Sequence, residues 1–403
     1  MTSQESSSAN NADDVISPKQ YRSNLWRLTL AQALSGASAV IVFATGAIVG
    51  HDLAPSAVLA TLPISVFVVG MAACVFPTGE IARCYGRRTA FVVGSLVGVL
   101  TGLLAMAAVL LGSFWLFCLA TFFGGAYASV VMSFRFAATD GLPAKKRPQA
   151  LSLVMAGGIV AGVIGPQLVT HTMQLWPSQR FAATFLAQAL VALLAGGILF
   201  GVDSPKPLKQ HVVMSRPLAE IALQPRFICA VICGAASYTI MNFLMTAAPL
   251  AMHLHGHSQA SANSGIQWHV IAMYAPSFFT GKLISRFGAT AISALGIVLT
   301  GVSAIVGLLG NDVGHFWGLL ILLGVGWNFG FLGASALVLE CHQPEEKNRV
   351  QSLNDFIIFA LMAIGSFSSG GLLSAYGWHS VLLVSLVPLV IAIVTLKLAS
   401  GRA

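Results

Sequence analysis

Residues 79–88 read Gly79-Glu-Ile-Ala-Arg-Cys-Tyr-Gly86-Arg87-Arg88, and residues 281–288 read Gly281-Lys-Leu-Ile-Ser-Arg286-Phe-Gly288. Both stretches have two glycines seven positions apart, with basic residues between or after them. Each follows a long apolar stretch, and the two copies lie about half a chain apart. Such an arrangement is typical of membrane proteins built from two parallel repeats of several helices. The copies therefore predict a chain divided into two similar halves.

The composition excludes a soluble protein. Hydrophobic residues make up 56% of the 403 residues and charged residues only 8%, whereas a soluble domain has about 25% charged residues. A membrane-spanning helix needs ~20 apolar residues. Twelve stretches come close to or exceed this length: 24–50, 55–78, 88–111, 113–138, 148–170, 180–201, 225–254, 261–283, 289–310, 313–339, 349–373 and 377–398. We therefore expect an all-α polytopic membrane protein with twelve transmembrane helices.

The basic residues lie on one side of the predicted membrane. They precede the first span, follow the second and fourth, and recur in the polar interval at the middle of the chain. Because cytoplasmic loops are rich in Lys and Arg, we expect both termini inside the cell. These loops account for the net charge of +8, so no nucleic-acid partner is expected. The predicted parts are a disordered cytoplasmic tail, a six-helix half, a cytoplasmic linker and a second six-helix half: 1–23, 24–202, 203–224 and 225–403.

The first glycine stretch resembles the loop between the second and third helices of the major facilitator superfamily. The family signature reads Gly-x-x-x-Asp-x-x-Gly-Arg-Arg/Lys, and four residues match it: Gly79, Gly86, Arg87 and Arg88. Arg83 stands where the family usually has aspartate. The resemblance implies two pseudo-symmetric halves that rock around a solute site near the middle of the membrane.

Soft side chains occupy the centres of two predicted spans. Met241 and Met245 are four positions apart in the seventh span, and His269 and Met273 have the same spacing in the eighth. Residues four apart share one face of a helix. Thioether sulfur favours Cu(I) and imidazole also binds copper, so these four residues are a candidate metal site. Methionine is equally a common packing residue, and the residues alone leave both interpretations open.

Both Met/His motifs also resemble those of a bacterial group within the superfamily, the CcoA-like copper importers (CalT group). Further stretches are similar to the same group: Phe134-Arg-Phe-Ala-Ala, Gly162-Val-Ile-Gly-Pro166 and Arg349-Val-Gln-Ser-Leu-Asn-Asp-Phe356. The resemblance implies copper import across the bacterial inner membrane, with copper as the transported ion rather than a permanent cofactor. It also implies a role in cytochrome c oxidase biogenesis, with a copper-accepting chaperone or oxidase assembly proteins as partners. Relatives that import riboflavin lack the two motifs.

Two further groups could pass copper along the same route. The histidines of His253-Leu-His255-Gly-His257 are a hypothetical capture site at the outer mouth. Cys229 and Cys233, one helical turn apart in the seventh span, would receive the ion on the inner side. Histidines at loop ends are often only solvated, and buried cysteine is a frequent apolar residue. Both interpretations stay open for both groups.

Arg135 and Asp355 are a candidate inner gate. Each lies about a turn inside the cytoplasmic end of its span, the fourth and the eleventh. A partly desolvated ion pair between them could hold the inner ends of the two halves together; alternatively, each is hydrated or bonded to nearby backbone. A buried carboxylate at mid-span, usual in proton-driven carriers, is not found, so the sequence leaves the driving force open.

The alternative to copper is an importer of riboflavin or another small organic solute. In that case the Met and His side chains only line the cavity, and aromatic residues stack on a flat ring: Trp268, Tyr274, Trp327 and Phe331. An efflux pump is a weaker possibility. No clustered carboxylates, activated nucleophile or phosphate-binding glycine loop indicates catalysis, so we do not expect an enzyme. We also do not expect a sensor, because the sequence has no soluble domain that could transmit a signal.

Overall fold

A computed structural model describes residues 17–56, 59, 62–203 and 216–400. Within these ranges the chain forms helices and no strand. The first half contains α1 (Pro18–Leu53), α2 (Leu62–Tyr85), α3 (Arg87–Leu111), α4 (Phe114–Ala137), the short η3 (Ala144–Lys146), α5 (Arg147–Thr172) and α6 (Ala182–Phe200). The second contains α8 (Pro225–Leu254), α9 (Gln259–Tyr274), α10 (Ser277–Phe287), α11 (Ala289–Leu309), α12 (Val313–Val338) and α13 (Lys347–Ser400), with the short α7 (Leu218–Ala222) before it.

The first helix begins earlier than the sequence predicted. α1 starts at Pro18, so the expected disordered tail was wrong for residues 18–23, while residues 1–16 lie outside the described ranges. Ser17 caps the helix, because its hydroxyl accepts a hydrogen bond of 3.2 Å from the Gln20 N–H. Proline at the first helical position is pre-organised for this start. In the predicted linker, residues 204–215 also lie outside the described ranges, and α7 follows them.

Eleven described segments are long and apolar enough to cross a membrane. Two of them belong to α13, which bends at Gly377, where φ is +76°. Glycine adopts this left-handed backbone conformation without steric cost. The eleven segments correspond to the expected spans except the eighth, which is divided into α9 and α10.

The break in the eighth span is stabilised by one side chain of α12. Pro276 lies between α9 and α10 and lacks a backbone N–H, so the carbonyls of the preceding turn lose helical partners. The Asn328 amide donates hydrogen bonds of 2.6 Å to the Met273 carbonyl and to the Ser277 hydroxyl. Its oxygen accepts one of 2.6 Å from the Thr280 hydroxyl. Asn328 thereby supplies the partners that buried polar groups require.

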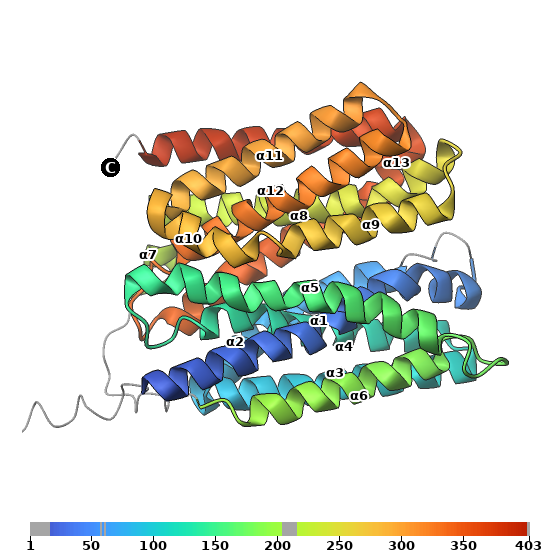
Figure 1. Cartoon of the computed structure of the whole chain (residues 1–403), viewed down its shortest axis with the longest axis horizontal. Helices are drawn as coiled ribbons and strands as arrows, with labels where there is room; N and C mark the ends of the chain where they lie inside the picture. Colours follow the sequence, from blue (N-terminus) through green and yellow to red (C-terminus); the bar gives the residue numbers. More distant parts are fainter. Residues whose placement is uncertain (1–16, 57–58, 60–61, 204–215, 401–403) are drawn as a thin grey trace, which may run out of the picture.

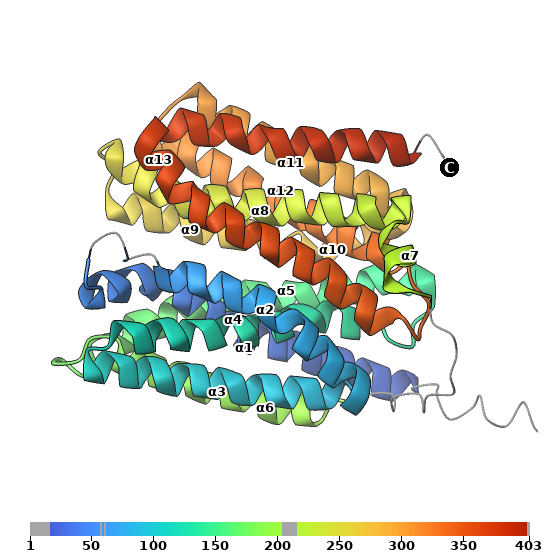
Figure 2. The same cartoon turned by 180° about the vertical axis from the view of Figure 1, so that it is seen from behind.

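The helices form two layers that correspond to the two halves of the chain (Figure 1; the reverse view is Figure 2). α1–α6 lie in one layer and α8–α13 in the other. Contacts between the layers run from α2 to α13, and from α5 to α9, α10 and α12. Both described chain ends and α7 lie at the same end of the molecule, which the distribution of basic residues assigns to the cytoplasm. We call it the inner end.

The repeated glycines occupy equivalent positions in the two halves. Gly86 and Gly288 precede α3 and α11 with φ of +87° and +88° and ψ of 159° and 153°. A Cβ atom on Gly79 would lie 1.9 Å from the Ser352 hydroxyl oxygen on α13, and one on Gly281 would lie 2.6 Å from the Cα of Gln149 on α5. In both copies, therefore, one glycine permits a turn and the other permits a close contact between the halves.

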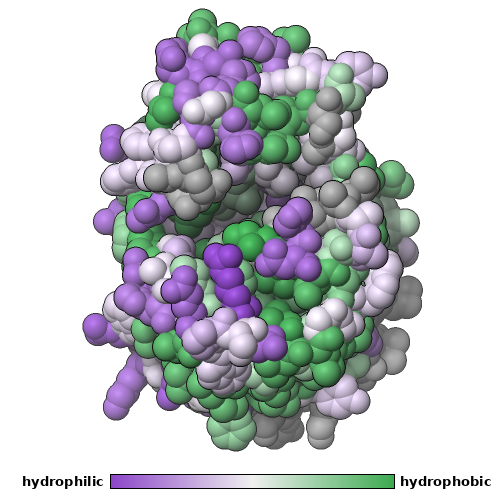
Figure 3. Space-filling view, turned by 90° about the vertical axis from the view of Figure 1, so that its right-hand side faces the viewer, coloured by the Kyte–Doolittle hydropathy of each residue, from purple (hydrophilic) through white to green (hydrophobic). Residues whose placement is uncertain are grey.

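The two halves are closed at the inner end and separated at the outer end. The outermost of the close glycine contacts between α5 and α9 lies near the middle of the membrane, where a Cβ on Gly162 would lie 2.6 Å from Val270. Figure 3, which looks onto the outer end, shows a hollow between the two layers. The molecule is therefore in an outward-facing state.

Candidate functional site

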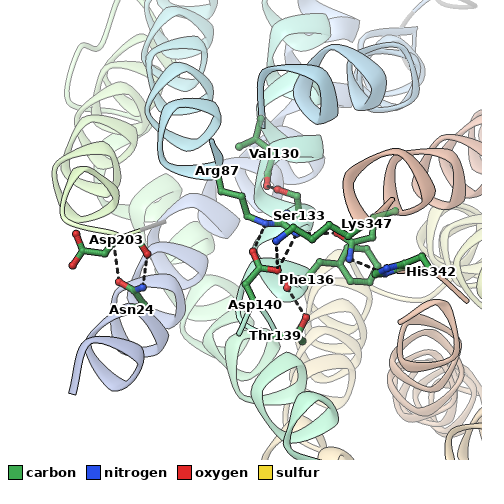
Figure 4. Close-up of polar contacts among 11 residues, drawn as sticks. Asn24, Arg87, Val130, Ser133, Phe136, Thr139, Asp140, Asp203, His342 and Lys347 are labelled. Carbon is green, nitrogen blue, oxygen red and sulfur yellow. Dashed lines mark hydrogen bonds and ion pairs between the residues drawn. The ribbon is translucent and has the colours of Figure 1, made fainter. Parts of the chain in front are cut away.

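A network of charges joins the halves at the inner end (Figure 4). Arg87 Nε lies 2.6 Å from an Asp140 carboxylate oxygen, and Lys347 Nζ of α13 lies 3.1 Å from the other. Arg87 also donates a hydrogen bond of 3.0 Å to the Gln351 side chain. Burial opposes ionisation of Asp140, but the charges of Arg87 and Lys347 keep its pKa below the ordinary value. Asp140 is therefore a carboxylate shared between the two halves.

The remaining basic residues of the glycine motif act within the first half. The Arg88 guanidinium lies 4.2 Å from the ring centroid of Phe200 on α6. Arg83, at the position where the family signature has aspartate, pairs with Glu80 on its own helix. Of these three arginines, Arg87 is therefore the one that contacts the second half.

Arg135 and Asp355 form a buried ion pair between α4 and α13. The distance from the Arg135 guanidinium to the carboxylate is 2.5 Å, and the two side chains are 0% and 6% exposed. Arg135 also donates to the Ser335 hydroxyl at 3.3 Å and to the Met132 carbonyl. The structure thus brings together the two residues proposed as an inner gate.

An aromatic cluster lies on the outer side of this ion pair. Trp327 and Phe331 of α12 are stacked, with ring centroids 5.1 Å apart. Tyr238 of α8 packs edge-on against both, at 5.4 and 5.0 Å, and Tyr274 of α9 packs against Trp327 at 5.7 Å. Phe359, one turn outward of Asp355 on α13, lies 5.7 Å from Tyr238. The cluster therefore draws on α8, α9, α12 and α13.

The two tyrosines connect this cluster, which we call the aromatic floor, with the first half. Tyr238 and Tyr274 are half-buried, whereas Trp327 and Phe331 are fully buried. The Tyr238 hydroxyl donates to the Met132 sulfur of α4 at 3.8 Å. The Tyr274 ring lies against Gly158 of α5, where a Cβ atom would approach within 2.4 Å. Tyr274 thus contacts the first half one turn inward of the contact between Gly162 and Val270, so the aromatic floor lies beneath the level at which the halves separate.

Trp268, also predicted to stack on a ring, does not belong to this group. Its side chain is 50% exposed, and no ring contact involving it occurs among the described residues. Sequence reasoning missed Tyr238, although it precedes Met241 by one turn on the same face of the seventh span.

Several buried polar atoms near the centre of the molecule have no hydrogen-bond partner. On α8 they belong to Ser237, Thr239, Asn242 and Thr246. In the first half, the Gln32 and Gln188 amide oxygens are also unpaired. Buried polar groups are normally satisfied, so such a set is suited to a solute that offers donors and acceptors. The sequence signal was the row of short polar side chains in an otherwise apolar seventh span.

The predicted metal ligands lie on two helices that each pack against α12. Met241 and Met273 are 3% and 6% exposed and belong to the apolar core that the two halves share, and Met245 packs against this core. His269 is fully buried, with Nδ1 2.6 Å from the Leu320 carbonyl oxygen of α12 and Nε2 unpaired. The methionines thus serve as packing residues. Coordination of a metal by the four side chains stays a prediction.

The proposed copper relay is distributed over both ends of α8. Cys229 and Cys233 are buried free thiols near the inner end. His255 and His257 at the outer end contact backbone carbonyls of Ala251 and Asn311 at 2.7 and 2.6 Å. His253 is exposed. Across the described part of the chain, no three His, Cys, Asp or Glu side chains are grouped closely enough to hold a metal ion.

Comparison with known proteins establishes the family. The model of the Major Facilitator Superfamily matches residues 28–275 and 227–401. The chain belongs to this superfamily of transporters and is not an enzyme. It is 49% identical over 382 residues to the riboflavin transporter RfnT of Brucella anthropi, covering 94% of this chain and 96% of that one. It is also 28% identical to the uncharacterized MFS-type transporter YddS of Bacillus subtilis, over 91% of this chain and 88% of that one.

Solved structures with the same fold include the human organic anion transporter MFSD10, with a TM-score of 0.77, 13% identity and coverage of 93% of this chain and 99% of that one. A bacterial homologue of the iron transporter ferroportin in an outward-facing state has a TM-score of 0.72 and 15% identity, covering 94% of this chain and 99% of the other. At these identities the likeness concerns the fold alone.

The riboflavin transporter corrects the copper interpretation. A relative 49% identical over 94% of the chain carries a different solute, so the prediction of a copper importer was wrong. The partners inferred from it, a copper-accepting chaperone and cytochrome oxidase assembly proteins, have no support. The misleading signal was methionine spacing, because the same spacing serves apolar packing between helices. The alternative from the sequence, a small organic solute such as riboflavin, is the better supported one.

Proposed function

We propose that this chain imports riboflavin, or a closely similar uncharged aromatic solute, across the bacterial inner membrane. The observation that carries the proposal is the aromatic floor beneath an outward-facing hollow, with unpaired polar atoms on the same helix as Tyr238. The 49% identity to a riboflavin transporter supports the same solute.

The chemistry of the floor matches a flat heteroaromatic ring with a polyhydroxyl chain. Tyr238 and Tyr274 offer ring surface beside the buried Trp327. Aromatic pairs contribute about 0.5–1.5 kcal/mol each beyond their buried area. On α8, the unpaired Asn242 amide nitrogen is a donor for hydroxyl groups, and the unpaired Thr239 and Thr246 hydroxyls can donate or accept. Arg135, which lies against Phe331, is already neutralised by Asp355, which favours an uncharged solute over its phosphate ester.

In this proposal the ion pair of Arg135 and Asp355 is the inner gate. It links α4 to α13 beneath the aromatic floor in the outward-facing state. Opening of the inner end requires this pair to separate, together with the contacts of Arg87, Asp140 and Lys347 closer to the cytoplasm. The halves would then rock apart and release the solute into the cytoplasm.

Uptake of radiolabelled riboflavin by cells that lack their own riboflavin transport tests the proposal. The chain is expected to raise uptake, and Tyr238→Ala is expected to reduce it about tenfold through loss of ~1.5 kcal/mol of ring contact. Trp115→Ala is the matched control, because Trp115 is 64% exposed and lies outside the cluster. Uptake no greater than in cells without the chain, at equal membrane levels, would contradict the proposal.

A further inference from the structure

Asp355 is distinguished from every other carboxylate of the described spans by its burial. The candidate spans contain one other acidic residue, Glu80, which is exposed at the inner end of α2. Asp355 is 4% exposed and lies eight positions into α13. An ionisable residue buried within a membrane segment is costly and is commonly part of an ion or proton pathway.

The charged and titratable groups around Asp355 are few. α4 contributes Arg135, and α8 contributes Tyr238, which interacts electrostatically with both members of the pair. Asn354, on the same helix, donates a hydrogen bond of 2.9 Å to the carboxylate. From α12, Ser335 accepts from Arg135 and carries no charge. Asp355 is therefore neutralised by a single cation, and protonation of Asp355 would leave Arg135 without a counter-charge.

A polar cavity connects Asp355 with the inner charge network. It has a volume of about 30 Å³ and extends to Arg87. α2 contributes no ionisable group to its wall. A cavity of this size has room for about two water molecules. Hydroxyl and amide side chains line it between the two charged groups: Thr78, Ser129, Ser133, Asn348, Gln351 and Ser352.

Asp355 thus lies between the aromatic floor and the inner charge network. On its outer side is the aromatic floor, since Phe359, one turn outward, packs against half-buried Tyr238. On its inner side is the polar cavity that leads to Arg87. The carboxylate also belongs to the contact that must separate before the inner end opens.

We propose that Asp355 binds the coupling proton of a proton-driven symporter, an inference that rests on the proposed uptake function. A proton from the outer side forms an O–H bond with the Asp355 carboxylate, and no electrons are exchanged. The neutral carboxyl no longer attracts Arg135, so the gate contact weakens and the inner end opens with solute bound. The proton then leaves through the polar cavity to the cytoplasm, and the restored carboxylate pairs with Arg135 again.

The test uses the full-length protein in proteoliposomes with the membrane potential clamped at zero. With the outside about one pH unit more acidic, one proton per solute molecule predicts about tenfold accumulation of labelled riboflavin. Asp355→Asn is expected to abolish accumulation while still exchanging labelled for unlabelled riboflavin without a gradient. Glu340→Gln is the matched control, since Glu340 is an exposed carboxylate paired with Arg226. It is expected to accumulate riboflavin like the unmodified chain.

The outcomes separate the two proposals. Exchange by the unmodified chain without gradient-driven accumulation would overturn proton coupling and leave riboflavin transport standing. Accumulation by Asp355→Asn would overturn the role of Asp355. Absence of exchange in the unmodified chain would overturn the uptake function and the coupling with it. If Asp355→Asn loses exchange as well, Asp355→Glu provides the test. Exchange by Asp355→Glu without gradient-driven accumulation would contradict the proposal, and accumulation driven by the pH gradient would support it.

Discussion

The guanidinium of Arg135 lies 4.7 Å from the ring centroid of Phe331. Phe331 is also stacked on Trp327, so one side chain contacts both the aromatic floor and the gate. A solute that displaces the floor rings therefore acts directly on the ion pair of Arg135 and Asp355. This contact provides a physical route from solute binding to opening of the inner end.

Phe331→Leu should weaken the inner gate. Loss of a cation–π contact of about 1 kcal/mol corresponds to an approximately fivefold shift toward the inward-open state. Electron paramagnetic resonance distances between spin labels at Lys146→Cys and Arg286→Cys, both exposed positions, would report the shift. Phe200→Leu removes the exposed contact with Arg88 and should leave the distances unchanged. Equal distributions in both variants would refute the link.

Gly281→Ala should disfavour the outward-facing state. The added Cβ would lie 2.6 Å from the Gln149 Cα and from the Pro148 carbonyl oxygen, which are backbone atoms of the opposite half. The two halves would have to move apart at the inner end. Gly301→Ala is the control, because no atom lies within 4 Å of the added Cβ. Reduced riboflavin uptake in Gly281→Ala alone, at equal membrane levels, is expected; equal uptake would speak against the close contact.

Asn328→Ala should destabilise the protein through the break in the eighth span. The Met273 carbonyl and Ser277 hydroxyl would lose their partner, and each unsatisfied buried group costs about 1–3 kcal/mol. A lower unfolding temperature in detergent is expected. Asn311→Ala removes an amide whose oxygen has no partner and should change the unfolding temperature little. An unchanged temperature for Asn328→Ala would show that the break does not depend on this side chain.

Glu346 should make stability depend on acid pH. Hydrogen bonds from Arg216, at 2.9 and 2.7 Å, lower the pKa of Glu346 to about 2. A carboxyl group whose pKa falls on folding contributes its full stabilisation of the folded state at pH values above its unfolded pKa, which is about 4.3 for glutamate. That stabilisation is lost as the pH falls toward 2. Unfolding temperatures measured from pH 6 to pH 3 should fall less steeply for Glu346→Gln than for Glu345→Gln, an exposed neighbour. Parallel slopes would rule out this ion pair as the cause.

The sequence was sufficient for the architecture and insufficient for the solute. Hydropathy, basic loops and the repeated glycines predicted two six-helix halves, because membrane burial constrains every span. The break at Pro276 was missed, because a proline within a span does not by itself end the helix, as Pro249 inside α8 shows. At Pro276, the lost hydrogen-bond partner of the Met273 carbonyl is replaced by Asn328 of another helix, which the sequence does not indicate.

At the site, the ion-pair residues Arg135 and Asp355 could be named because charges within the spans are rare in such a chain. Three residues of the aromatic floor, Tyr274, Trp327 and Phe331, were named from the sequence. Its other members were not, because contacts among four helices depend on tertiary packing. Tyr238 in particular gave no signal apart from its position. The solute was misassigned because spacing alone does not distinguish a methionine ligand from a packing residue.

Direct binding of riboflavin to the purified protein tests the central claim most directly. Titration of the chain in detergent, followed by quenching of riboflavin fluorescence, is expected to show saturable binding. The affinity should fall about tenfold in Tyr238→Ala, because ~1.5 kcal/mol of ring contact is lost. It should stay unchanged in Trp115→Ala. Absence of saturable binding, or equal affinity in Tyr238→Ala, would contradict the assignment of the aromatic floor as the solute site.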